Sequence, residues 1–119
     1  MGNAVTHFEI VGADARLLQA FYEQAFDWQL KLTHPEYAMA LTGNAGINGG
    51  VGALAGGLSH VTVYIDVDDV QGTLERIGRL GGATVMPALE IPGGPTIALF
   101  SDPEGHVLGI AKRPVGDPS

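Results

Sequence analysis

The sequence contains no cysteine, which excludes disulfide bonds, thiolate nucleophiles and cysteine-based zinc sites. Basic residues are also few: six Lys and Arg stand against 13 Asp and Glu, giving a formal net charge of −7. Such an acidic chain does not suit a nucleic-acid backbone or an anionic membrane, so we expect neither as a partner. No apolar run approaches the roughly 18 residues of a membrane-spanning helix. No basic and apolar leader opens the chain either, and we expect a cytoplasmic protein.

The chain does have enough apolar residues for one folded core. It has 119 residues, of which 45% are hydrophobic and 16% charged, a composition typical of a globular protein. We therefore predict a single domain over residues 1–119. The 18 glycines and seven prolines indicate many tight turns between short strands.

The same order of predicted elements occurs twice. Alternating apolar and polar residues predict a strand over 4–11, and a helical period predicts a helix from Ala15 to Phe26 with Asp14 as its N-cap. A second strand of the same kind begins near His60, and Asp68 or Asp69 caps the helix that follows it. Further strands are predicted at 28–32, 37–41, 46–54, 83–86, 96–101 and 106–111. The sequence thus predicts two βαβββ modules, about 4–54 and 59–112, joined by a linker at 53–57 and followed by a tail at 113–119.

The first predicted helix carries a wide apolar stripe. Its members recur with a helical period, and they are Leu17, Leu18, Phe21, Tyr22, Ala25 and Phe26. We expect this stripe to be buried against Phe8 and Ile10 of the first strand.

Strand alternation also predicts which polar side chains share a face. His7 and Glu9 lie on one face of the first strand, and Thr62 and Tyr64 hold the equivalent positions in the second module. We predict that these faces line a cleft between the modules, with the helices outside.

The motifs resemble a known family over residues 4–112. They are the duplicated βαβββ order, the strand His7-Phe8-Glu9-Ile10 ahead of Phe21-Tyr22, the run Val67-Asp68-Asp69-Val70 and the hairpin Asp102-Pro103-Glu104-Gly105-His106. Together they are similar to the glyoxalase, bleomycin-resistance and extradiol-dioxygenase superfamily, the vicinal oxygen chelate proteins. The resemblance implies an α+β fold in which two tandem βαβββ modules form a curved mixed sheet around a cleft. It does not decide the function, because this fold hosts isomerases, dioxygenases, thiol transferases and drug-sequestering proteins.

Enzymes of that family hold a divalent metal with four inward-facing ligands, from the first and last strands of each module. By resemblance these positions are His7, Thr62, about Gly50 and Gly109. Only the histidine is a good ligand for zinc or a hard cation. We therefore expect no metal and no other cofactor, and keep a divalent metal held by His7, Glu9 and His60 as an alternative.

The candidate catalytic residues are His7, Glu9 and Tyr64, the first two as bases and the third as a donor to a carbonyl or enolate oxygen. The candidate ligand-binding residues, which share the predicted cleft, are His7, Glu9, Asn48, Thr62, Tyr64, Val107 and Gly109. Four of them have a structural alternative. His7 is a polar residue whose hydrogen bonds its neighbours satisfy, Glu9 pairs with His7 or a cross-sheet partner, Tyr64 fills the cleft, and Asn48 is a turn residue.

Three functions follow from these observations. The first is a small-molecule-binding protein or a metal-independent enzyme. The second is a divalent-metal lyase, isomerase or dioxygenase that uses His7. The third is a dimeric interaction domain whose cleft its own side chains fill. The expected partners are a small-molecule ligand and, by resemblance and because an exposed strand edge favours pairing, a second copy in a homodimer.

Overall fold

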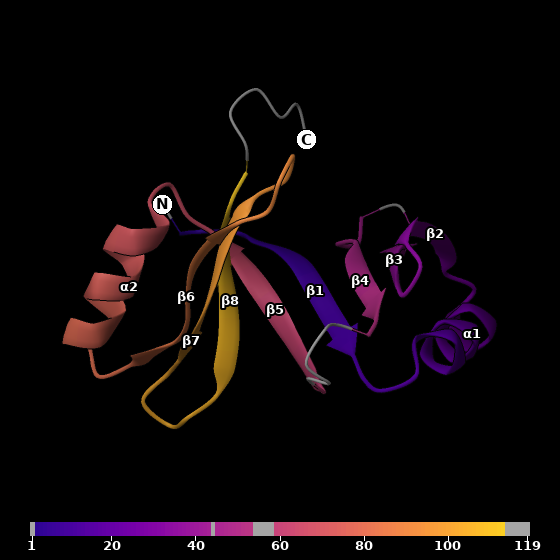
Figure 1. Ribbon diagram of the computed structural model, residues 1–119, viewed down its shortest axis with the longest axis horizontal. Helices are drawn as coiled ribbons and strands as arrows, with labels where there is room; N and C mark the ends of the chain where they lie inside the picture. The colour runs from indigo at the N-terminus through magenta and orange to yellow at the C-terminus, as the bar shows by residue number, and fades with distance from the viewer. Residues whose placement is uncertain (1, 44, 54–58, 114–119) are drawn as a thin grey trace. The chain divides into compact units, whose positions relative to one another are not determined.

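A computed structural model of the protein describes residues 2–43, 45–53 and 59–113. Its elements, in chain order, are β1 (Val5–Val11), α1 (Ala15–Phe26), β2 (Gln29–His34), β3 (Tyr37–Leu41), β4 (Gly49–Gly52), β5 (His60–Asp66), α2 (Val70–Arg79), β6 (Ala83–Glu90), β7 (Thr96–Ser101) and β8 (Val107–Lys112) (Figure 1). The α+β class and the twofold βαβββ order are confirmed. Most of the predicted linker lies outside the described residues, and the cleft and the module boundaries stay predictions.

The chain divides into two compact units. One contains residues 6–63, and the other contains residues 1–5 together with 64–119. We call them the first and second unit. Within the first, the strand order is β2-β3-β4-β1, with β1 parallel to β4 and the other pairs antiparallel. Gly49 of β4 leaves room for the ring of Phe8, its partner on β1. A Cβ atom at Gly49 would lie only 2.5 Å from that ring.

The second unit repeats this arrangement, with the strand order β5-β8-β7-β6 and only the β5–β8 pair parallel. The division between the units falls within β5, whose residues 60–63 belong to the first unit and 64–66 to the second. The helix α2 begins at its N-cap Asp69, whose Oδ1 accepts a hydrogen bond of 3.0 Å from the backbone N–H of Gly72. Its apolar stripe packs on the sheet, and the buried core consists of Val70, Leu74, Ala98 and Ile110. The registers of the two units correspond: Glu9 pairs with Gly50 in the first, and Tyr64 with Gly109 in the second.

The expected burial of the α1 stripe is wrong for several of its members. Leu17, Phe21 and Phe26 are 68%, 58% and 59% exposed. Because each helical residue turns by about 100°, the helix side that carries Ala15 and Tyr22 points away from Leu17 and Phe21. Tyr22 instead stacks on Trp28 with ring centroids 5.5 Å apart. The stripe was too wide for one sheet of short strands to cover.

The predicted turn before β8 is confirmed. The backbone N–H of Gly105 donates a 2.9 Å hydrogen bond to the carbonyl oxygen of Asp102, and Gly105 has a φ of 91° that favours glycine. Neither α1 nor α2, the helices of the described residues, is long and apolar enough to cross a membrane.

Candidate functional site

The buried carboxylate of Glu9 is the centre of a polar cluster in the first unit. Glu9 is only 6% exposed. Its Oε2 accepts a 2.7 Å hydrogen bond from the hydroxyl of Tyr37, and its Oε1 lies 3.0 Å from Nε2 of His60. Both carboxylate oxygens are therefore engaged by side chains. We call these three residues the Glu9 cluster.

Three strands supply the cluster. Glu9 lies on β1, Tyr37 is the first residue of β3, and His60 is the first residue of β5. Alternation along β1 turns Glu9 away from its neighbours Phe8 and Ile10. The phenol of Tyr37 therefore reaches Glu9 across the intervening strand β4, which a glycine makes possible.

The geometry fixes where the proton of His60 lies. An ionised carboxylate only accepts hydrogen bonds, so Nε2 of His60 must carry the hydrogen that points at Oε1 of Glu9. In the neutral imidazole, Nδ1 then has a free electron pair and can accept a proton. A carboxylate that sets the tautomer and orientation of a histidine in this way prepares it for general-base chemistry.

His7 lies two residues before Glu9 on the same face of β1 and is partly buried. Burial lowers the pKa of its imidazole below the ordinary value of 6.5, and the negative charge of Glu9 opposes this shift without overcoming it. His7 is therefore neutral at neutral pH, when its imidazole can both donate and accept a hydrogen bond.

We expect His7 to contribute a pH dependence to folding stability. Because its pKa is lower in the folded protein than in the unfolded chain, the unfolded state takes up the proton more readily. This part of the stability is present above pH 6.5 and is lost as the pH falls towards the folded pKa. In urea unfolding across this range, the free energy of unfolding of His7→Gln should fall less steeply on acidification than that of the native protein. An identical slope for both proteins would contradict the burial of His7.

The other candidates in the first unit differ in surroundings. Thr62 is 6% exposed and lies two residues beyond His60 on β5, as alternation predicts. Asn48 is exposed, and its Oδ1 accepts a 3.2 Å hydrogen bond from the backbone N–H of Thr42. This bond favours the structural alternative for Asn48, a turn residue.

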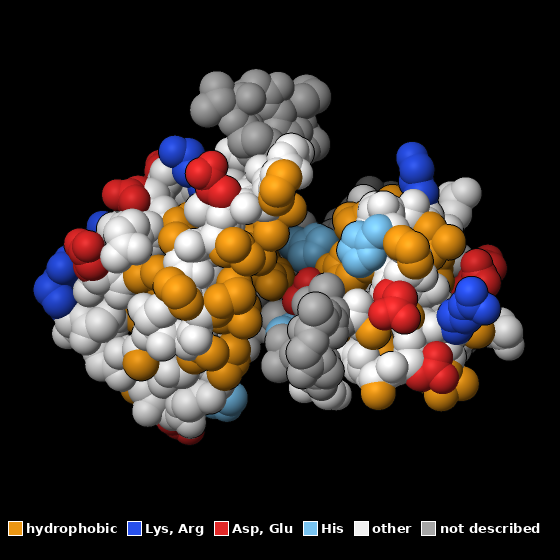
Figure 2. All heavy atoms as spheres, viewed as in Figure 1, with side chains coloured by type: hydrophobic (Ala, Val, Ile, Leu, Met, Phe, Trp, Pro, Cys, Tyr) orange, Lys and Arg blue, Asp and Glu red, His pale blue; other side chains and the backbone are white. Residues whose placement is uncertain are grey.

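Tyr64, Val107 and Gly109 belong to the second unit, and their grouping with His7 and Glu9 stays a prediction. Tyr64 is 6% exposed, and a Cβ atom at Gly109 would overlap its ring. Val107 is 38% exposed. Apolar side chains are also visible over the strands of this unit in Figure 2, and the exposed large ones on β6 are Val85 and Leu89. Val107 offers apolar contact, and the catalytic role of Tyr64 stays a prediction.

Tyr37 and His60 are the members of the cluster that sequence reasoning missed or misassigned. Tyr37 was only part of a predicted strand, and His60 was considered only as a metal ligand. The structural alternative of a cross-sheet partner for Glu9 agrees with the structure, since His60 is such a partner. A glycine opposite a buried acid, as Gly50 is opposite Glu9, was the available signal that an aromatic side chain could lie above it.

The residues present do not fit the divalent metal that the family resemblance implies. A Cβ atom at Gly50 would overlap the Tyr37 hydroxyl, and one at Gly109 would overlap the Tyr64 ring, so both last-strand positions are closed to a ligating side chain. Both oxygens of Glu9 already have partners. Among the described residues, no group of three His, Asp or Glu side chains could hold a metal ion.

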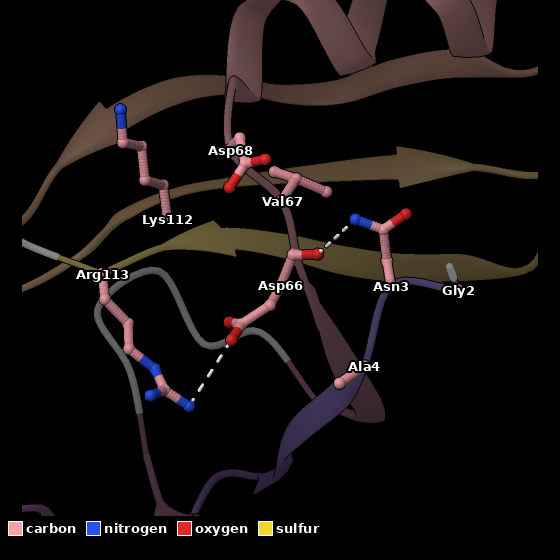
Figure 3. Close-up of a pocket in the computed structure, with 8 residues that line it drawn as sticks. All are labelled: Gly2, Asn3, Ala4, Asp66, Val67, Asp68, Lys112 and Arg113. Atoms are coloured by element: carbon pink, nitrogen blue, oxygen red, sulfur yellow. Dashed lines mark hydrogen bonds and ion pairs between the residues drawn. The ribbon is translucent and has the colours of Figure 1, made fainter.

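A cavity of about 400 Å³ lies in the second unit, and none of its lining residues is a candidate residue (Figure 3). Its lining residues are Gly2, Asn3, Ala4, Asp66, Val67, Asp68, Lys112 and Arg113. Arg113 forms a 3.4 Å ion pair with Asp66, whose backbone carbonyl accepts from the side-chain amide of Asn3 at 2.9 Å. Two of its four charged lining residues thus bind each other, and no histidine lines the cavity, so we place the candidate site at the Glu9 cluster.

Comparison with known proteins agrees with this fold. The family model of the Glyoxalase/Bleomycin resistance protein/Dioxygenase superfamily matches residues 4–110. A superfamily member from Vibrio splendidus 12B01 has a similar structure, with a TM-score of 0.65 at 14% identity over 93% of this chain and 99% of that one. The structural likeness concerns the fold alone.

Two curated relatives are more similar in sequence. The "Putative glyoxylase CFP32" of Mycobacterium bovis is 29% identical over 105 residues, which are 81% of this chain and 39% of that protein. A "Glyoxylase-like domain-containing protein" of Didymella fabae is 27% identical over 120 residues, covering 92% of this chain and 94% of the relative. The chain thus spans well under half the length of the mycobacterial relative.

Proposed function

The chain belongs to the Glyoxalase/Bleomycin resistance protein/Dioxygenase superfamily, and on this premise we propose that it binds a small molecule at the Glu9 cluster without a metal ion. The observation that carries the proposal is the pair of contacts to Glu9, from Tyr37 at 2.7 Å and from His60 at 3.0 Å. They give the site a histidine that a buried carboxylate orients.

The cost of burying Glu9 supports a functional role. Taking a carboxylate out of water is unfavourable, and apolar residues of similar size often stabilise a fold at least as well as a buried ion pair. His7 lies on the same strand face as this acid, and burial lowers its pKa; perturbed pKa values are typical of functional sites. An apolar residue at position 9 would serve the fold as well, which favours a functional reason for the acid.

The proposed chemistry is reversible proton transfer to His60. A carbonyl compound with an acidic C–H bond gives its proton to Nδ1 of His60, and the electron pair of that bond remains on the ligand as an enolate. Glu9 stabilises the imidazolium that forms, because its carboxylate already holds the Nε2 hydrogen. Return of the proton to the ligand restores both partners. His7, which is neutral, supplies a further hydrogen-bonding group on the same strand.

We also propose a cytoplasmic location and a homodimer. The exposed apolar side chains of Leu17 and Phe21 on α1 support pairing, since a second copy would cover them.

A fragment screen tests the proposal. Small aromatic and carbonyl compounds are added to the native protein in EDTA, and melting temperature and histidine NMR signals are recorded. We expect at least one compound to raise the melting temperature and to shift the signals of His60 and His7. His60→Gln should lose this response, whereas His106→Gln, which removes an exposed imidazole of the second unit, should keep it.

Two results would contradict metal-free binding at this site. The first is that no compound stabilises the protein in EDTA but one does after Mn²⁺, Fe²⁺, Ni²⁺ or Zn²⁺ is added, which would favour the metal-dependent alternative. The second is that His60→Gln binds the same compounds as tightly as the native protein.

A further inference from the structure

The path from Tyr37 to Glu9 crosses a whole strand. In the first unit β4 lies between β3 and β1, and the register places Met39, Gly50 and Glu9 side by side on these three strands. Tyr37 lies two residues before Met39, so its side chain runs diagonally over β4. Neighbouring strands are separated by about 4.8 Å, and the long phenol covers the distance that a shorter side chain could not.

Gly50 lies directly under this path. Among the described residues other than its chain neighbours, the atom nearest to a Cβ atom built at Gly50 is the Tyr37 hydroxyl oxygen, followed by two carbons of the same ring. The hydroxyl is also the group that donates to Glu9. A side chain at position 50 would therefore need the very space in which the Tyr37–Glu9 hydrogen bond forms.

We propose that Gly50 is a positioning residue for the Glu9 cluster, acting through Tyr37. The absence of a side chain at position 50 lets the Tyr37 hydroxyl reach Oε2 of Glu9. Fixing Oε2 fixes the rotation of the carboxylate and thereby directs Oε1 at Nε2 of His60. The importance of this effect for ligand binding rests on the proposed function, but the effect itself exists without a ligand.

The neighbouring glycines of β4 have other roles. A Cβ atom at Gly49 would meet the apolar ring of Phe8, and one at Gly52 would meet the backbone of Glu36. Neither contact involves a member of the Glu9 cluster. Gly49→Ala is therefore a matched control for Gly50→Ala, because the strand, the substitution and the presence of an aromatic neighbour are the same.

The test is the tautomer of His60, read from the ¹⁵N chemical shifts of its ring in long-range ¹H–¹⁵N spectra of the native protein and three variants. The native protein and Gly49→Ala should show Nε2 protonated and Nδ1 not. In Gly50→Ala and in Tyr37→Phe the ratio of the two tautomers should fall towards that of a free imidazole, and the carboxylate ¹³C signal of Glu9 should move.

Tyr37→Phe adds no atoms to the strand. If Gly50→Ala does not fold, Tyr37→Phe therefore tests whether the Tyr37–Glu9 hydrogen bond sets the His60 tautomer. The proposal is overturned if the His60 and Glu9 signals of Gly50→Ala or of Tyr37→Phe match those of the native protein. It is also overturned if Gly49→Ala alters them as much as Gly50→Ala does. Because these spectra need no ligand, a native protein that binds none of the fragments would contradict the proposed function and leave this result standing.

Discussion

Replacing Glu9 with glutamine should lower the free energy of unfolding by about 1.5–3 kcal/mol, the range for hydrogen bonds to a charged group. The carboxylate accepts from two donors, the Tyr37 hydroxyl and Nε2 of His60. A carboxamide has one accepting oxygen, and its NH₂ group cannot accept from the second donor. In the variant, either one donor loses its partner or His60 changes tautomer so that Nε2 accepts from the NH₂ group. In both cases the hydrogen bonds to a charged acceptor are lost, although the side chain keeps its size.

Urea unfolding monitored by circular dichroism measures this effect. Glu23→Gln is the matched control, because Glu23 is exposed on α1 in the same unit, and an exposed substitution of this kind should change stability by no more than about 0.5 kcal/mol. If the two variants unfold at the same urea concentration, Glu9 does not form the contacts on which the site depends.

Ile110→Ala should destabilise the protein by about 2–5 kcal/mol, as expected when a large aliphatic side chain is removed from a packed core. Ile110 is 2% exposed and packs with Val70, Leu74 and Ala98. It lies on β8 and pairs with Ile65 on one side and with Ala98 on the other, so the cavity would open between the sheet and α2.

Chemical unfolding of Ile110→Ala and of Val61→Ala provides the comparison. Val61 is an aliphatic residue of β5 that is 73% exposed, and its truncation should cost less than about 0.5 kcal/mol. Equal losses for the two variants would show that the core of the second unit is not where the structure places it.

Local patterns of the sequence predict the elements well and their environment less well. The helix from Ala15 to Phe26 and its N-cap Asp14 were predicted as found, because capping and helical period depend on neighbouring residues. The burial of Phe21 was not, since it depends on how much sheet lies beneath the helix. The helix period gives the direction of a side chain but not the width of the surface that covers it.

At the candidate site too, local patterns predict the face on which a side chain lies but not the residues that it contacts. Alternation in β1 placed His7 and Glu9 on one face, and burial of Glu9 agrees with an inward position. The partners of Glu9 are 28 and 51 residues away in the sequence, and no local period connects them. Tyr37 reaches Glu9 because β4 places Gly50 beneath its ring. That placement depends on the registers of β3, β4 and β1, which local sequence does not determine.

The most direct test of the account is the state of His60 in the native protein, measured by long-range ¹H–¹⁵N NMR first in EDTA and then with one equivalent of Zn²⁺. The account predicts a single tautomer with the hydrogen on Nε2, held by Glu9, and no change of the His60 and His7 signals when Zn²⁺ is added. Averaged tautomers in EDTA, or stoichiometric shifts of both histidines with Zn²⁺, would contradict a metal-free site centred on Glu9.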